Sequence, residues 1–114
     1  MPFVFYHNPN CSKSCQALQL LEGKGVQLQV RKYLEEPLSL NELTHLLVLL
    51  DKKPSELIRQ GEGLYKTLGL DQITDANQLI QAMVDNPQLI ERPILSNGQQ
   101  ARIGRPPEQV LGII

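Results

Sequence analysis

Cys11 is the residue of this chain whose type and position best fit nucleophilic chemistry. It lies between an apolar segment, Phe3–Tyr6, that is typical of a buried strand and a segment, 16–21, whose apolar residues share one helical face. The Asn8-Pro9-Asn10 turn between them places Cys11 at or next to the helix N-cap. Unpaired backbone N–H groups and the positive end of the helix dipole both stabilise a thiolate at that position. We therefore expect Cys11 to be a reactive thiolate.

The neighbours of Cys11 strengthen this interpretation. Lys13 adds a positive charge, and Ser12 and Ser14 carry hydroxyls that can donate to the sulfur. Such surroundings lower a cysteine pKa from about 8.5 to roughly 3.5–7.5. The alternative is a cysteine that serves only as a compact apolar residue. The polar residues on both sides of Cys11 favour the reactive thiol.

Length and composition indicate one domain with no strong electrostatic preference. The 114 residues suffice for a single core, and the net charge of −1 provides no basic field for binding nucleic acid. No run of about 18 apolar residues predicts a membrane span, and Met1-Pro2 leads straight into the first strand without a signal-peptide pattern. A cytoplasmic protein is expected. Its two cysteines, four residues apart, then indicate chemistry rather than a structural disulfide.

The elements around Cys11 predict an α/β fold. Gly23-Lys24-Gly25 ends the first helix, and residues 26–31 alternate between apolar and polar as in a half-buried strand. A strand, a helix and a strand in one sheet normally form a right-handed parallel crossover. A helical region follows over about 39–85, with expected helices at Leu40–Leu50 (opened by a Ser39/Glu42 capping box), 54–59, 62–68 and 76–84 (capped by Asp75).

The end of the chain predicts a hairpin. Asn97-Gly98 separates the β-like segments Ile94–Ser96 and 100–103, and a closing helix is expected over 106–111. Because hairpin strands are antiparallel and the first pair is parallel, the sheet should be mixed, with the helical region as an insertion.

Two Arg-Pro pairs, Arg92-Pro93 and Arg105-Pro106, flank this hairpin, so both arginines should emerge at the same end of the sheet. Converging guanidinium groups suit the paired oxygens of a tetrahedral oxyanion. Two ordinary surface arginines explain the same sequence equally well.

Four strings along the chain carry a family resemblance. In chain order they are Tyr6-His7-Asn8-Pro9-x-Cys11-x-x-Ser14, Glu56-Leu57-Ile58-Arg59, Glu91-Arg92-Pro93-Ile94 and Gly104-Arg105-Pro106. Together they resemble the glutaredoxin-dependent arsenate reductases, and in particular short relatives of the classical enzyme. The resemblance covers essentially the whole chain. It implies a single thioredoxin-like domain over 1–114, with a cis-proline at Pro93 facing the active cysteine.

The resemblance also implies an activity and a set of site residues. Cys11 would attack arsenate, and Arg59, Arg92 and Arg105 would bind this or a similar oxyanion. Supporting roles fall to His7, Ser14 and Pro93. Glutathione would act as co-substrate and glutaredoxin as partner, and no bound cofactor or metal is implied. A monomer is expected, with the oligomeric state left open by the sequence. For His7, a strand-end histidine satisfied by the backbone is an equal alternative.

Two features depart from the family pattern. Position 15 is Cys15, where better-known members tend to have arginine, and we expect it to be mainly a packing residue of the helix. The alternative is an intramolecular resolving cysteine, which would require the first helical turn to loosen for Cys15 to pair with Cys11. The chain also ends soon after Arg105-Pro106-Pro107. Two other functions therefore stay open. One is a different glutathione-linked thiol oxidoreductase. The other is a redox-responsive regulator that binds RNA polymerase, although such regulators typically carry Cys-x-x-Cys and the second cysteine is here replaced by Ser14.

Overall fold

The computed structural model describes residues 3–114, which pack as two compact units. The first unit joins the described residues up to Glu36 with Arg92–Ile114, and the second is Pro37–Glu91. The predicted helical region, about 39–85, falls within the second unit. A single thioredoxin-like domain over the whole chain stays a prediction.

The first unit contains a four-stranded mixed sheet in the order β2-β1-β3-β4. Strand β1 (Phe3–Tyr6) pairs in parallel with β2 (Leu28–Arg31) and antiparallel with β3 (Ile94–Ser96), which forms a hairpin with β4 (Ala101–Ile103). The register places Tyr6 opposite Ile94. The predicted α/β class with a mixed sheet is confirmed.

Helix α1 (Ser12–Gly23) connects the two parallel strands, with Cys11 as its N-cap. The predicted strand at 26–31 begins two residues later than expected, at Leu28. The N–H of Val26 still donates to the carbonyl of Leu21, so the chain remains folded back on the helix end at that point. Gly25, with φ +69°, provides the left-handed backbone that this reversal requires.

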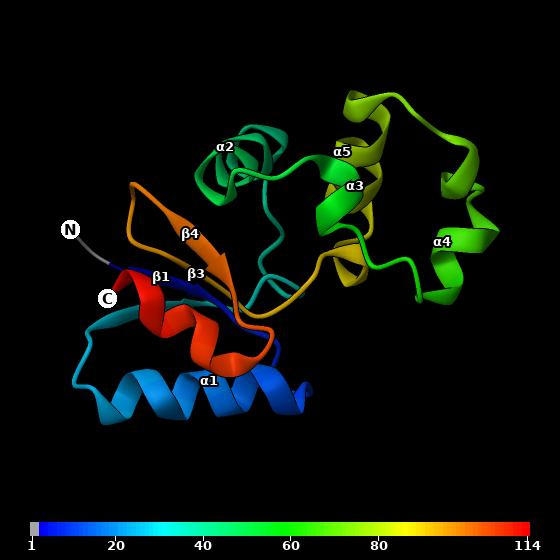
Figure 1. Ribbon diagram of the computed structural model, residues 1–114. Helices are drawn as coiled ribbons and strands as arrows, with labels where there is room; N and C mark the ends of the chain where they lie inside the picture. Colours follow the sequence, from blue (N-terminus) through cyan, green and yellow to red (C-terminus); the bar gives the residue numbers. More distant parts are fainter. Residues whose placement is uncertain (1–2) are drawn as a thin grey trace. The chain divides into compact units, whose positions relative to one another are not determined.

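The core of this unit lies on one face of the sheet, against α1 and the 3-10 helix η3 (Pro107–Ile113). Figure 1 shows both helices on the same side of the strands. Fully buried side chains from the sheet and from both helices fill the space between them: Phe5, Leu95, Ala17, Leu21 and Val110. The predicted closing helix is therefore present, but as a 3-10 helix that extends to Ile113.

The hairpin turn follows its predicted chemistry. Gly98 has φ +91°, and the Asn97 side chain accepts hydrogen bonds from the backbone N–H groups of Gln99 and Gln100. Because Gln100 is used in the turn, β4 begins at Ala101, one residue later than predicted.

The second unit is helical, and its helix starts follow the capping signals of the sequence. The Ser39 hydroxyl and the Glu42 carboxylate form the predicted capping box, and the Asp75 carboxylate accepts the N–H of Asn77. Helices α2 and α3 pack against α5. The elements are α2 (Leu40–Leu50), α3 (Pro54–Leu57), α4 (Gly63–Thr67), η1 (Leu70–Gln72), α5 (Ala76–Asp85) and η2 (Pro87–Leu89). Within residues 3–114, no helix combines the length and apolar character needed to cross a bilayer.

Candidate active site

The loop between β1 and α1 presents Cys11 at the start of the helix. The carbonyl of Asn8 accepts the N–H of Cys11 at 3.0 Å, and the Asn8 side chain accepts the N–H of Asn10 at the same distance. The carbonyl of Cys11 then accepts the N–H of Cys15, which begins the helical ladder. Cys11 itself has extended backbone angles and is half-buried. The predicted N-cap position of the thiol is confirmed.

The surroundings of the Cys11 sulfur favour its ionised form. Burial alone raises the pKa of the thiol, but the backbone N–H of Ser14, the Arg92 guanidinium and the backbone N–H of Lys13 together bring that pKa below its ordinary value. The positive charge at the sulfur therefore comes from Arg92. Lys13, which was expected to supply that charge, contributes through its backbone N–H, and its side chain is exposed.

Ser14 holds the loop instead of donating to the sulfur, as its hydroxyl was expected to do. Its side chain is completely buried, and its Oγ accepts the N–H of Asn8 at 3.1 Å. The same Oγ lies 2.7 Å from Nδ1 of the buried His7 ring, in a hydrogen bond between the two side chains. The hydroxyl thus joins the end of β1 to the first turn of α1.

His7 is satisfied on both its backbone and its ring. Its N–H donates to the carbonyl of Arg31 at 2.9 Å, and its ring packs against Phe5 in addition to the Ser14 hydrogen bond. Burial, with a smaller effect from the Lys32 charge, lowers the pKa of His7. The ring is therefore neutral at neutral pH and supports the loop that carries Cys11.

The two Arg-Pro pairs meet at the base of the hairpin, as predicted. Both the Arg92–Pro93 and the Arg105–Pro106 peptide bonds are cis, and Pro93 is fully buried. The Arg105 Nε donates to the carbonyl of Arg92 at 3.0 Å, which brings the two arginines together. Because the Arg92 guanidinium also lowers the pKa of Cys11, this end of the sheet links the hairpin base to the thiol.

Arg59 belongs to the second unit, where two carboxylates contact it. Its NH1 lies 3.3 Å from Glu62 Oε2, and its Nε lies 3.4 Å from Glu91 Oε1. Its N–H donates to the carbonyl of Leu89 at 2.7 Å. The assignment of Arg59 to the oxyanion stays a prediction from the motif.

Sequence reasoning missed three contributors to the site. Asn8 supports the Cys11 loop, and the preference of Asn for hydrogen bonds to nearby backbone N–H groups was an available signal. The Cys15 thiol, half-buried rather than packed in the core, donates to the carbonyl of Pro9 at 3.3 Å. Gly104 leaves no room for a side chain, since a Cβ there would lie 2.7 Å from Cγ of Pro93. No local signal in the sequence indicated the last two contacts.

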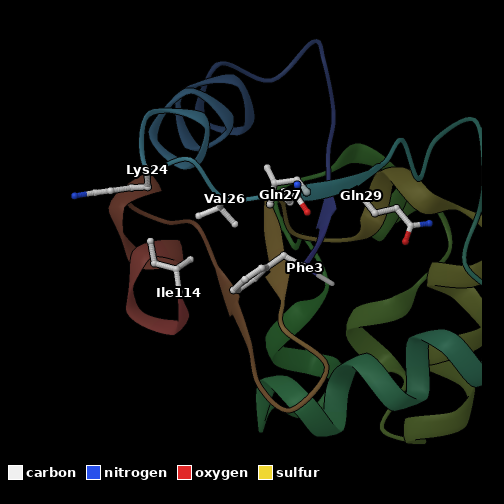
Figure 2. Close-up of a pocket in the computed structure, with 7 residues that line it drawn as sticks. Phe3, Lys24, Val26, Gln27, Gln29 and Ile114 are labelled. Atoms are coloured by element: carbon white, nitrogen blue, oxygen red, sulfur yellow. The ribbon is translucent and has the colours of Figure 1, made fainter. Parts of the chain in front are cut away.

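A groove of about 730 Å³ in the first unit lies near the other end of α1, away from the thiol. Figure 2 shows that its walls come from the start of β1, the segment around β2 and the end of the chain, and among its lining residues are Phe3, Val26 and Ile114. No cysteine, histidine or arginine lines it. Across residues 3–114, no three His, Cys, Asp or Glu side chains gather as metal ligands. The clearest arrangement for chemistry in the first unit is therefore at Cys11.

Comparison with known proteins agrees with the predicted family and fold. The chain is 53% identical to "Uncharacterized protein YfgD" of Escherichia coli K12, over 96% of this chain and 93% of that protein. It is 44% identical to "Arsenate reductase" of Haemophilus influenzae, over the full length of both. The structure of "Arsenate reductase from Vibrio cholerae" superposes with a TM-score of 0.96 at 47% identity, covering 100% of this chain and 98% of that one. The thioredoxin-like α/β fold is confirmed. A sequence model of the ArsC family matches residues 6–113, and the chain belongs to the ArsC family.

Proposed function

We propose that this protein is an arsenate reductase in which Cys11 is the nucleophile and glutathione and glutaredoxin supply the electrons. The observation that carries the proposal is the Cys11 thiol at the N-cap of α1, where backbone N–H groups and the Arg92 guanidinium lower its pKa. A guanidinium beside a thiolate both stabilises the thiolate and can bind an oxygen of an incoming oxyanion. Relatives named arsenate reductase, at 44% and 40% identity over their full length, support the same activity.

The first step would join the Cys11 sulfur to arsenic. The thiolate attacks the arsenic(V) centre, an As–S bond forms, and one oxygen leaves as water after it takes up a proton. Arg92 would hold the remaining oxygens and stabilise the charge that develops on them. Arg105, whose Nε already donates to the Arg92 carbonyl, would contact oxygens through its terminal nitrogens. Arg59 is proposed as a third ligand on the strength of its motif alone.

The electrons would come from two thiols. Glutathione condenses with the arsenic and a second oxygen leaves as water. A glutaredoxin thiolate then attacks the glutathione sulfur. The As–S bond to glutathione breaks, its electron pair stays on arsenic, and arsenic(V) becomes arsenic(III) while the two thiols become a mixed disulfide. Water finally displaces Cys11 from arsenic, releasing arsenite and the thiol. Phosphate fits the same arginines but offers no such reduction.

We further propose that the reaction takes place in the cytoplasm, where the glutathione pool is kept reduced. No bound cofactor is required by the scheme, because glutathione enters as a co-substrate and glutaredoxin as a partner protein. Arginine forks and a thiolate supply the binding and the nucleophile.

The proposal is tested by measuring arsenite directly, by chromatographic separation of the two arsenic oxidation states. Arsenite should form with glutathione and glutaredoxin together and should fall to background when either is omitted. If arsenite forms when thioredoxin replaces glutathione and glutaredoxin, the proposed source of electrons is wrong. Absence of arsenite with every reductant, from folded protein whose Cys11 still forms a mixed disulfide with glutathione, would favour another thiol substrate.

A further inference from the structure

The end of β4 is joined to the segment that precedes β3 by three contacts. The Gly104 N–H donates to the carbonyl of Pro93 at 2.8 Å, and the Arg105 Nε donates to the carbonyl of Arg92 at 3.0 Å. Gly104 also approaches the Pro93 ring so closely that a Cβ would lie 2.7 Å from its Cγ. The main chain of Arg92 and Pro93 is therefore held by Gly104 and Arg105.

The Arg92 side chain depends on this anchor for its position. Its Nε is buried and has no hydrogen-bond partner among the residues that the structure describes. A guanidinium without a hydrogen bond at Nε is free of the restraint that this atom usually gives. The guanidinium thus extends from a main chain that the Gly104 and Arg105 hydrogen bonds hold in place. That placement matters because the Arg92 guanidinium is one of the groups that lower the pKa of the Cys11 thiol.

We infer that Arg105 is a positioning residue for Arg92, which it holds against the Cys11 sulfur through the hydrogen bond from its Nε to the Arg92 carbonyl. This inference goes beyond the oxyanion-binding role proposed above, because it assigns Arg105 a task that needs no substrate. It uses the Nε atom, in the middle of the side chain, and not the positive charge. The charge and the donor can therefore be separated by substitution.

Two substitutions at position 105 make this separation. Arg105→Lys keeps the positive charge but places a methylene where Nε was. Arg105→Gln removes the charge but keeps an N–H donor, Nε2, at the same place along the side chain. Arg102→Lys is the matched control, since Arg102 is an exposed arginine of the same hairpin. His7, Lys13 and Lys32, which are titratable groups near the loop, are unchanged in all three variants.

The measurement is the rate at which iodoacetamide alkylates Cys11, followed on its peptide by mass spectrometry between pH 5 and 9, with Cys15 replaced by serine in every protein. This readout needs neither arsenate nor glutaredoxin, so its failure is separate from failure of the proposed function. At pH 6 we expect Arg105→Lys to react about three- to tenfold more slowly than the parent, which is half to one unit in the thiol pKa. Arg105→Gln and Arg102→Lys should react at close to the parent rate.

A second comparison shows whether Arg105 acts through Arg92. In an Arg92→Ala background, Arg105→Lys should have no further effect on the alkylation rate, because the residue that it positions is absent. An undiminished effect in that background would overturn the inference. The inference would also be overturned if Arg105→Gln slowed the alkylation of Cys11 and Arg105→Lys did not. In that case the positive charge of Arg105, and not its Nε donor, would control the thiol. Thermal melting of each variant verifies that the compared proteins are folded.

Discussion

Nδ1 of His7 lies 2.7 Å from Oγ of Ser14, and both side chains are buried. The bond joins the end of the first strand to the first turn of the helix that Cys11 caps. The same Oγ accepts the N–H of Asn8, so a single hydroxyl holds both sides of the nucleophile loop. The side chains of His7 and Ser14 therefore hold the loop that presents the thiol through hydrogen bonds to each other and to the loop backbone.

Replacing Ser14 with alanine should destabilise the protein, because it leaves the N–H of the half-buried Asn8 and the buried His7 ring without this partner. We expect a loss of about 1–3 kcal/mol in the free energy of unfolding. Urea denaturation measures it. Ser12→Ala is the control, since Ser12 is exposed on the same turn and should change stability by less than about 0.5 kcal/mol. Equal effects of the two substitutions would contradict this role of Ser14.

The buried His7 should make stability depend on pH. Because burial and the Lys32 charge place its pKa below that of the unfolded chain, the unfolded state binds more protons between the two values. Stability should therefore fall as the pH is lowered from about 6.5 through the folded pKa. The difference between wild type and His7→Asn isolates this contribution, since asparagine can keep a donor near Ser14 without titrating in this range. Parallel stability curves for the two proteins between pH 7.5 and 5 would show that the ring does not titrate as predicted.

Arg92→Lys should weaken arsenate binding although the charge is the same. Lysine is a point charge and cannot present two parallel N–H groups to a pair of oxygens. We expect the KM for arsenate to rise about tenfold, corresponding to one charge-assisted hydrogen bond. Arg102→Lys, the same change at an exposed position of the hairpin, should leave KM unaltered. An unchanged KM for Arg92→Lys would show that Arg92 does not bind arsenate through two parallel N–H groups.

Gly104→Ala should be costly. Its Cβ would lie 2.7 Å from Cγ of Pro93 and 3.1 Å from Cγ1 of Val110, so the buried proline or the base of the hairpin must shift. We expect a loss of about 1–3 kcal/mol on denaturant unfolding. Gly23→Ala, in helix α1 with nothing within 4 Å of the new Cβ, should instead stabilise by about 0.5–1 kcal/mol. A neutral Gly104→Ala would mean that the hairpin base adapts easily.

Local signals predicted the elements well because those signals act over a few residues. The Cys11 N-cap, the Ser39/Glu42 capping box and the Asn97-Gly98 turn are each set by neighbours in the chain. The predicted starts of β2 and β4 were one or two residues too early, because local signals do not show hydrogen bonds to neighbouring elements or within the turn. The sequence does not show that Val26 is still bonded to the helix end.

The contacts at the site were harder to predict because they depend on how strands pair. Arg92 reaches Cys11 only because β3 lies beside β1 with Tyr6 opposite Ile94, a register that no spacing in the sequence determines. The sequence suggests Lys13 as a source of positive charge, but the Arg92 guanidinium supplies it. Two positions past the N-cap, the backbone N–H of Lys13 points toward the N-terminal end of the helix and hence toward the Cys11 sulfur, while its side chain is exposed. The family resemblance, not the physics of the chain, supplied the link between Arg92 and Cys11.

The role of Cys11 as the nucleophile of an arsenate reductase is tested by arsenate-dependent NADPH oxidation in a coupled assay with glutathione, glutaredoxin and glutathione reductase. Wild type, Cys11→Ser and Cys15→Ser are compared. If Cys11 is the nucleophile, wild type should turn over and Cys11→Ser should not. Cys15→Ser should keep most of the wild-type rate, because a serine hydroxyl can still donate to the Pro9 carbonyl that Cys15 contacts. Turnover by folded Cys11→Ser, or none by folded wild type, would contradict this role of Cys11.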